Sequence, residues 1–152
     1  MFRRAVRVFV FVLPLVAALV SACGTPTEPT DAKLPSPTDG LVPVTQTFNG
    51  TLVSGGSILH TFHTMPGLVK VTLDSLAPAA DAPLIGLGIG MWDGLSCQIV
   101  FETPFGAPGS ELIGTASIDS QVCVKVWDLG TLAADAALKY QLTAVHNEKP
   151  PS

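Results

Sequence analysis

The chain has 152 residues, of which 47% are hydrophobic and 13% charged, and its net charge at pH 7 is −4. Eight basic residues against twelve acidic ones provide no basic patch, which argues against nucleic acid as a partner. The length that remains after the first forty residues is that of one small domain with its own core.

The first 22 residues have the organisation of an export signal. MFRRAVR carries three arginines and no acid, and residues 8–20, VFVFVLPLVAALV, are apolar throughout. The alternative is a membrane-spanning helix, which needs ~20 apolar residues, whereas this run is shorter and has Pro14 in its middle. A cleaved signal is the preferred interpretation, and its removal leaves five basic and twelve acidic residues, a net charge of −7.

The end of that apolar run, Val20-Ser21-Ala22-Cys23, resembles the lipobox of bacterial lipoproteins, in which small residues precede a cysteine. The resemblance implies that Cys23 becomes the first residue, carries a diacylglycerol on its thiol and often an acyl chain on its amine, and anchors the chain in a membrane. Gly24 stands where aspartate is the usual inner-membrane retention signal, which implies the outer membrane if the host has two membranes. The alternative is an ordinary signal followed by a chance cysteine.

Residues 23–43 read as a tether between this cysteine and the domain. Residues 24–43 contain five prolines, four threonines and no aromatic residue, so they are expected to be disordered or in polyproline II. At ~3.1 Å per residue such a segment reaches roughly 60 Å. The alternative is an unstructured N-terminus without a spacing role. Residues 44–147 then form the domain, and residues 148–152 a disordered tail.

Alternation of apolar and polar residues predicts strands throughout residues 44–147. Apolar residues occupy one face in each of four segments, for example Val122, Val124 and Val126 in residues 121–128. Clusters of Gly, Pro and Asp such as SGGS, TMPG and FGAPGSE separate the strands. The sequence therefore predicts an all-β domain, a single antiparallel β-sandwich or jelly roll of about eight strands. The expected strands are 44–53, 57–64, 68–76, 84–92, 97–101, 111–118, 121–128 and 139–145.

The succession FNGTL, GGSILHTF, GLVKVTLDSL, CVKVWDLG and YQLTAV resembles the bacterial pre-peptidase C-terminal domain over roughly residues 46–147. That family is a small jelly-roll β-sandwich on exported proteins, and it includes stand-alone lipoproteins of unknown function. Its second strand often reads Asp-x-aromatic-x-Phe, and Ile58, His60 and Phe62 occupy those positions here. Without the acid and without an attached peptidase, the resemblance implies the fold and no activity.

With Cys23 assigned to lipid, Cys97 and Cys123 remain for an oxidising compartment, where two cysteines usually form a disulfide. The loop they would close has ~27 residues, which corresponds to about 3–4 kcal/mol of stability in the chain-entropy model. The alternative is a reactive thiol, but no His–Asp or His–Asn pair lies near either cysteine in the sequence.

Few residues suggest chemistry. His60 and His63 in HTFH are three apart on a predicted strand and point to opposite faces, so no metal site and no cofactor is predicted. Motifs of hydrolases, metalloproteases and calcium loops are absent from the sequence. Four carboxylates fall near predicted turns, where aspartate is a common turn former: Asp93, Asp119, Asp128 and Asp135.

Gly86, Gly88 and Gly90 lie on one face of a predicted strand. Such a face receives a partner strand or an aromatic ring, or packs tightly within the domain. Trp92 and Trp127 are candidates for stacking on a sugar ring or a peptide; the alternative is that they cover a sheet edge.

Three functions follow from these patterns. The first is a non-catalytic cell-envelope lipoprotein whose β-sandwich makes protein–protein or structural contacts. The second is a carbohydrate- or peptide-binding module that uses Trp92 or Trp127. The third is an unrecognised hydrolase, which requires a polar, convergent pocket. The expected partners are the membrane, through lipid on Cys23, and an envelope protein or glycan.

Overall fold

The computed structural model describes residues 40–78 and 83–151. The predicted signal, Cys23 and most of the predicted tether lie outside these residues. Within them, no helix has the length and apolar character needed to cross a membrane. Seven strands account for the secondary structure of this part of the chain: β1 (Val42–Val53), β2 (Ser57–Ala77), β3 (Ile85–Trp92), β4 (Cys97–Gly106), β5 (Glu111–Ala116), β6 (Ser120–Asp128) and β7 (Ala137–Glu148).

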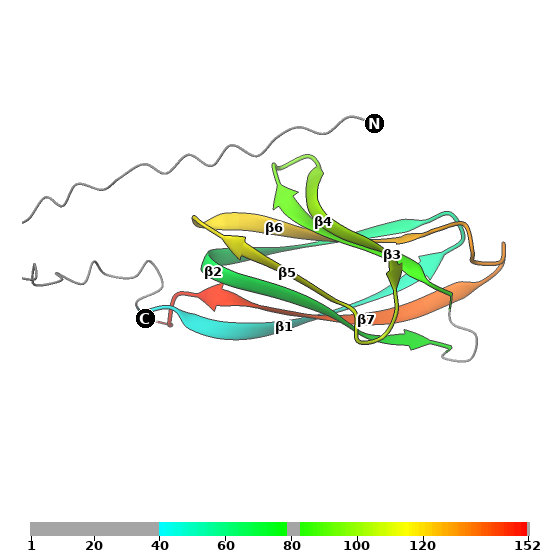
Figure 1. Ribbon diagram of the computed structural model, residues 1–152, viewed down its shortest axis with the longest axis horizontal. Coiled ribbons are helices and arrows are strands. Elements are labelled where there is room, and N and C mark those ends of the chain that lie inside the picture. Colours follow the sequence, from blue (N-terminus) through cyan, green and yellow to red (C-terminus); the bar gives the residue numbers. More distant parts are fainter. Residues whose placement is uncertain (1–39, 79–82, 152) are drawn as a thin grey trace, which may run out of the picture. The chain divides into compact units, whose positions relative to one another are not determined.

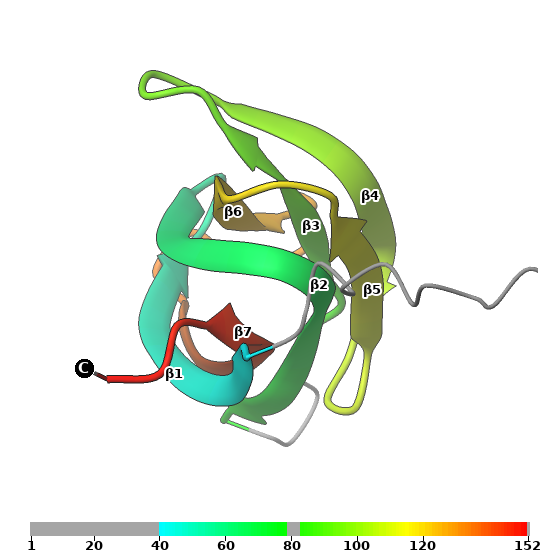
Figure 2. The ribbon, with the colours of Figure 1, turned by 90° about the vertical axis from the view of Figure 1, so that its left-hand side faces the viewer.

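The strands form one antiparallel network with the order β1-β7-β2-β6-β3-β4, and β5 pairs with β2. One layer contains β1, β7, the second half of β2 and β5, and the other contains the first half of β2, β6, β3 and β4 (Figures 1 and 2). The all-β, sandwich-like prediction is therefore confirmed. The first strand begins at Val42, so the last two residues of the predicted tether already belong to β1.

β2 is one strand where the sequence predicts two. The TMPG cluster, residues 64–67, was expected to be a turn, and this expectation is wrong: β2 continues through it for 21 residues and changes partners there from β6 to β7 and β5. A register shift between Met65 and Lys70 marks the bend. Pro66 has no partner in either sheet register, so its missing N–H costs no ladder hydrogen bond. Gly67 has φ 138°, which disfavours a side chain.

The core lies between the two layers and is built from the predicted alternation. The apolar faces of β2, β6 and β7 contribute Val71, Val124 and Leu142, each 0% exposed. Each fully buried aliphatic side chain of this kind stabilises the fold by about 1.5–3 kcal/mol. Further members are Leu52, Phe62, Val69, Leu73, Leu76, Ile85, Leu87, Ile89, Leu112, Ala116, Val122, Val126, Leu132, Leu138, Tyr140 and Ala144.

Polar side chains also enter this core, among them Tyr140, His146 and Thr64, which is 0% exposed. Tyr140 shares a hydrogen bond of 2.8 Å between its hydroxyl and His60 Nε2, and burial raises the pKa of Tyr140 to about 12. Gly50 makes room for the Tyr140 ring, since a Cβ at that position would overlap it. His146, 1% exposed, has no hydrogen-bond partner for either ring nitrogen and lies against Phe62 with ring centroids 4.7 Å apart.

Candidate functional site

A disulfide joins Cys97 at the start of β4 to Cys123 on β6, with Cα atoms 5.8 Å apart. β4 and β6 flank β3, so this bond draws the start of β4 over the outer face of β3. Gly90 permits the approach, because a Cβ there would lie 2.8 Å from the Ile99 Cα on β4. The disulfide and the glycine thus fix one end of the outer face.

Trp127 covers the other two glycines of this strand. On β6 it stands directly opposite Gly86 of β3, and a Cβ at Gly86 would overlap three atoms of the indole. At Gly88 a Cβ would lie 3.3 Å from Trp127 Cζ3 and 3.1 Å from Ile99 Cδ1. Two of the alternatives for the glycine face therefore hold together: an aromatic ring lies on it, and that ring packs there from within the domain.

A polar hollow of about 520 Å³ lies beside this ring on the outer face; we call it the Trp127 groove. Glu102 of β4 and Lys125 of β6 both stand opposite Gly88, so they border the groove from two sides of a position without a side chain. The Lys125 ammonium lies 5.9 Å from the Trp127 ring centroid. Its complete lining is Gly55, Gly56, Ser57, Ile99, Glu102, Lys125, Trp127 and Asp128.

Asp128 shapes the rim of the groove. Its carboxylate accepts hydrogen bonds from the backbone N–H groups of Gly55 (2.8 Å), Thr131 (3.1 Å) and Leu132 (3.2 Å). These bonds, that from Gly55 foremost, lower the pKa of Asp128. Asp128 therefore joins the β1–β2 turn to the segment after β6 and leaves Glu102 as the carboxylate available to a ligand.

Trp92 lies apart from this groove. It ends β3, opposite Cys97, and is half-buried. Six residues of extended strand, about 20 Å, separate it from Gly86, which stands opposite Trp127. The structure does not bring the two predicted stacking residues together.

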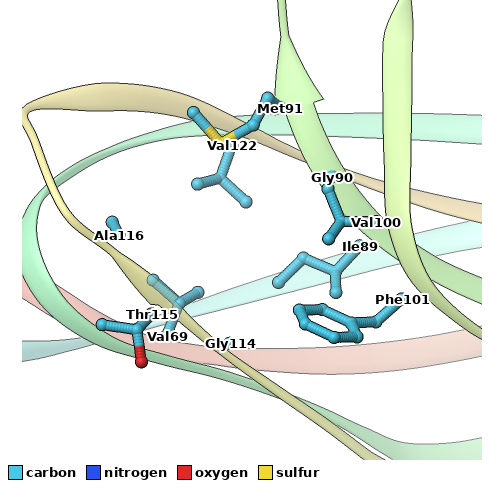
Figure 3. A pocket seen from close by; sticks show the side chains of 10 residues that line it. All are labelled: Val69, Ile89, Gly90, Met91, Val100, Phe101, Gly114, Thr115, Ala116 and Val122. Carbon is cyan, nitrogen blue, oxygen red and sulfur yellow. The ribbon is translucent and has the colours of Figure 1, made fainter.

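A second, apolar pocket of about 80 Å³ lies between β3–β4 and β5; we call it the seam pocket. Figure 3 shows Ile89, Val100 and Phe101 on one side of it and Thr115 and Ala116 on the other. Among the strands of residues 40–78 and 83–151, β4 and β5 each have one hydrogen-bonded neighbour, and they lie on the same side of the domain in Figure 2. Val69, Gly90, Met91, Gly114 and Val122 complete its lining.

Exposed apolar side chains lie in and near the seam pocket: Val100 and Phe101 line it, and Ile113 directly precedes its lining residue Gly114. Val100 and Phe101 of β4 are 60% and 49% exposed, Phe105 at its end 68%, and Ile113 of β5 52%. Of the residues that guard free strand edges, β4 has Glu102 and Pro104 and β5 has Glu111, and neither strand contains a lysine or arginine. No sequence signal singled out this surface, because alternation marks Val100 and Ile113 only as residues of one face or the other.

The histidines lie as the strand register requires. His60 points into the core toward Tyr140, and His63 lies on the opposite, exposed face with a hydrogen bond to Asp119. Within residues 40–78 and 83–151 no three His, Cys, Asp or Glu side chains gather at one point. Asp93 caps the β3–β4 turn by accepting from the Ser96 N–H (2.7 Å) and the Leu95 N–H (2.8 Å), which lowers its pKa.

No family model matches this sequence, and no curated protein is similar to it. Among solved structures, a similar one is the crystal structure of Aeromonas hydrophila PliG, a periplasmic lysozyme inhibitor of g-type lysozyme. The identity is 9% and the TM-score 0.47, over 68% of this chain and 86% of that one. This likeness is distant, and the function proposed below rests on the two surfaces described above. The resemblance to the pre-peptidase C-terminal domain stays a prediction.

Proposed function

We propose that this chain is a non-catalytic lipoprotein of the bacterial cell envelope whose β-sandwich binds another protein. The observation that carries the proposal is the seam pocket with its rim of exposed apolar side chains beside two free strand edges. A contiguous apolar patch of this kind on a folded domain marks an interaction surface. An extended segment that pairs with a free edge has its backbone groups satisfied by the edge, and its side chains give specificity.

The dimensions of the pocket indicate what the partner presents. A volume of about 80 Å³ with an apolar lining suits one apolar side chain rather than a larger ligand. Phe101 closes one wall by lying 3.5 Å from where a Cβ of Gly114 would be. We expect the partner to insert one aliphatic or aromatic anchor there and to cover Val100 and Ile113.

The location of the protein is part of the proposal. Export by residues 1–22 and lipid attachment at Cys23 place the domain in the envelope, on the outer membrane if the host has two. The mass of the membrane-extracted protein tests this part. We expect residues 23–152 plus acyl chains, and an unlipidated mass starting elsewhere would contradict the anchor.

Photo-crosslinking in the native cells tests the protein-binding surface. A photoreactive residue at Ile113 (52% exposed on β5) is expected to give one discrete adduct, and the same residue at Val53 (54% exposed at the end of β1) is expected to give none. Adding Val100→Asp is expected to abolish the adduct at position 113. Equal adducts at positions 113 and 53, or an adduct that survives Val100→Asp, would contradict the assignment of the seam.

A second candidate function, carbohydrate or peptide binding, is favoured by one observation. Trp127 is half-buried in a polar hollow whose other side chains include an acid, a base and a hydroxyl. This surface lies on the outer face of the layer that contains β3 and is separate in its lining from the seam pocket.

A further inference from the structure

We propose that the Trp127 groove binds an uncharged pyranose ring, stacked on the Trp127 indole and held by Glu102, Lys125 and Ser57. The inference deepens the second candidate function and is independent of protein binding at the seam. Trp92 is not part of this site.

The Trp127 indole provides the platform on which the sugar ring stacks. The Trp127 ring rests with one face on the backbone of β3, because Gly86 and Gly88 have no side chains to hold it away. Trp127 also lines the groove, where the Lys125 ammonium lies over its ring, 5.9 Å from the centroid. An indole face carries negative potential, and the C–H face of a pyranose is weakly positive and apolar, so the two surfaces complement each other. A ring supported in this way has lost its rotamer freedom before the ligand arrives.

Polar groups surround the Trp127 ring. Glu102 accepts hydrogen bonds, Lys125 donates them, and the Ser57 hydroxyl does both, which matches the donor and acceptor character of sugar hydroxyls. No ion pair between Glu102 and Lys125 exists among the described residues, so Glu102 remains available, and Lys125 can donate to a ligand that replaces its contact with the Trp127 ring. Their common register position opposite Gly88 places them on either side of one open site.

The charge and the volume of the groove indicate the kind of ligand that fits it. The groove carries two carboxylates, Glu102 and Asp128, and one ammonium, Lys125, so its net charge disfavours phosphorylated or acidic ligands. Its volume of about 520 Å³ falls within the 300–1,000 Å³ typical of small-molecule sites, and polar groups with one aromatic ring line it. A neutral sugar fits this lining better than an apolar ligand does.

The test uses the full exported chain with Trp92→Phe, which leaves Trp127 as the single tryptophan. The probes are a β-1,4-linked glucose tetramer, a β-1,4-linked N-acetylglucosamine trimer, a β-1,4-linked mannose tetramer and an α-1,4-linked glucose tetramer. At least one is expected to change the fluorescence of Trp127 saturably below about 10 mM, ten times a 1 mM Kd. Absence of saturable change with all four would overturn the proposal.

Two variants and one map locate the binding. Lys125→Ala and Glu102→Gln, at exposed or half-exposed positions, are each expected to weaken binding about tenfold, and Lys139→Ala on β7 serves as the matched control. In NMR spectra the sugar is expected to shift the amide signals of Ser57, Lys125 and Trp127 and to leave that of Ile113 unchanged. Binding that survives both variants, or shifts confined to other residues, would overturn the site. Crosslinking at Ile113 is measured separately. Failure of sugar binding therefore leaves the proposal of protein binding at the seam pocket unaffected, and failure of crosslinking leaves the proposal for the Trp127 groove unaffected.

Discussion

His146 is a buried imidazole whose replacement by leucine should stabilise the protein. The side chain is 1% exposed, and neither ring nitrogen has a hydrogen-bond partner. A buried polar group without a partner costs about 1–3 kcal/mol, and leucine of similar volume removes that cost while keeping contact with Phe62. We therefore expect His146→Leu to raise the free energy of unfolding by about 1–3 kcal/mol at pH 7.5.

The same side chain makes stability depend on pH. Burial lowers the pKa of His146 below 6.5, and the charge of His63 adds to this. The Glu148 carboxylate, 4.0 Å from Nε2, and the polar backbone of Asn147, which makes no hydrogen bond of good geometry with either ring nitrogen, oppose it only in part. Burial also lowers the pKa of His60. The unfolded chain therefore takes up protons near pH 6.5, whereas these histidines in the folded chain stay neutral until a lower pH. The free energy of unfolding is highest above pH 6.5 and falls as the pH drops below it. One such group contributes a slope of at most about 1.4 kcal/mol per pH unit.

Urea unfolding of the exported chain with Cys23→Ser, followed by tryptophan fluorescence between pH 7.5 and 5, measures both effects. His146→Leu should reduce the acid slope and leave the His60 part. Lys139→Ala, at an exposed position on β7, is the control and should shift stability by no more than about 0.5 kcal/mol. A loss of stability in His146→Leu at pH 7.5, or an unchanged acid slope, would refute the reasoning.

Three further predictions concern the packing that shapes the two surfaces. Gly86→Ala should displace the Trp127 ring, shift its fluorescence emission and lower the free energy of unfolding by about 1–3 kcal/mol. Gly114→Ala, whose Cβ would lie 3.5 Å from Phe101, should be close to neutral. Equal losses of stability in urea unfolding would contradict the close packing of Trp127 on Gly86. Replacing both Cys97 and Cys123 by alanine should lower the free energy of unfolding by about 3–4 kcal/mol, as should reductant on the unchanged chain, and insensitivity to reductant would show that no disulfide forms. Leu142→Ala should cost about 2–5 kcal/mol because the side chain is 0% exposed, and a loss below 1 kcal/mol by thermal unfolding would place it outside the core.

Local alternation predicts which side chains are buried but not which strands meet. Val122, Val124 and Val126 were expected on one face from period two alone, and all three are buried. The turn expected at residues 64–67 follows from composition, yet Pro66 and Gly67 serve a bend within β2 instead. A Pro-Gly pair permits either outcome, and the choice depends on whether new partners, here β7 and β5, continue the strand.

The glycine face illustrates the same limit at the candidate site. The sequence shows that Gly86 and Gly88 share a face and predicts a close neighbour there, but it cannot say which aromatic ring arrives. That depends on the β3–β6 register, which places Trp127 opposite Gly86 and Lys125 opposite Gly88. A shift of one residue would turn Trp127 into the core and remove the groove. The glycines therefore allow one tryptophan to lie against the sheet, and the proposed site depends on the strand register as well as on its residues.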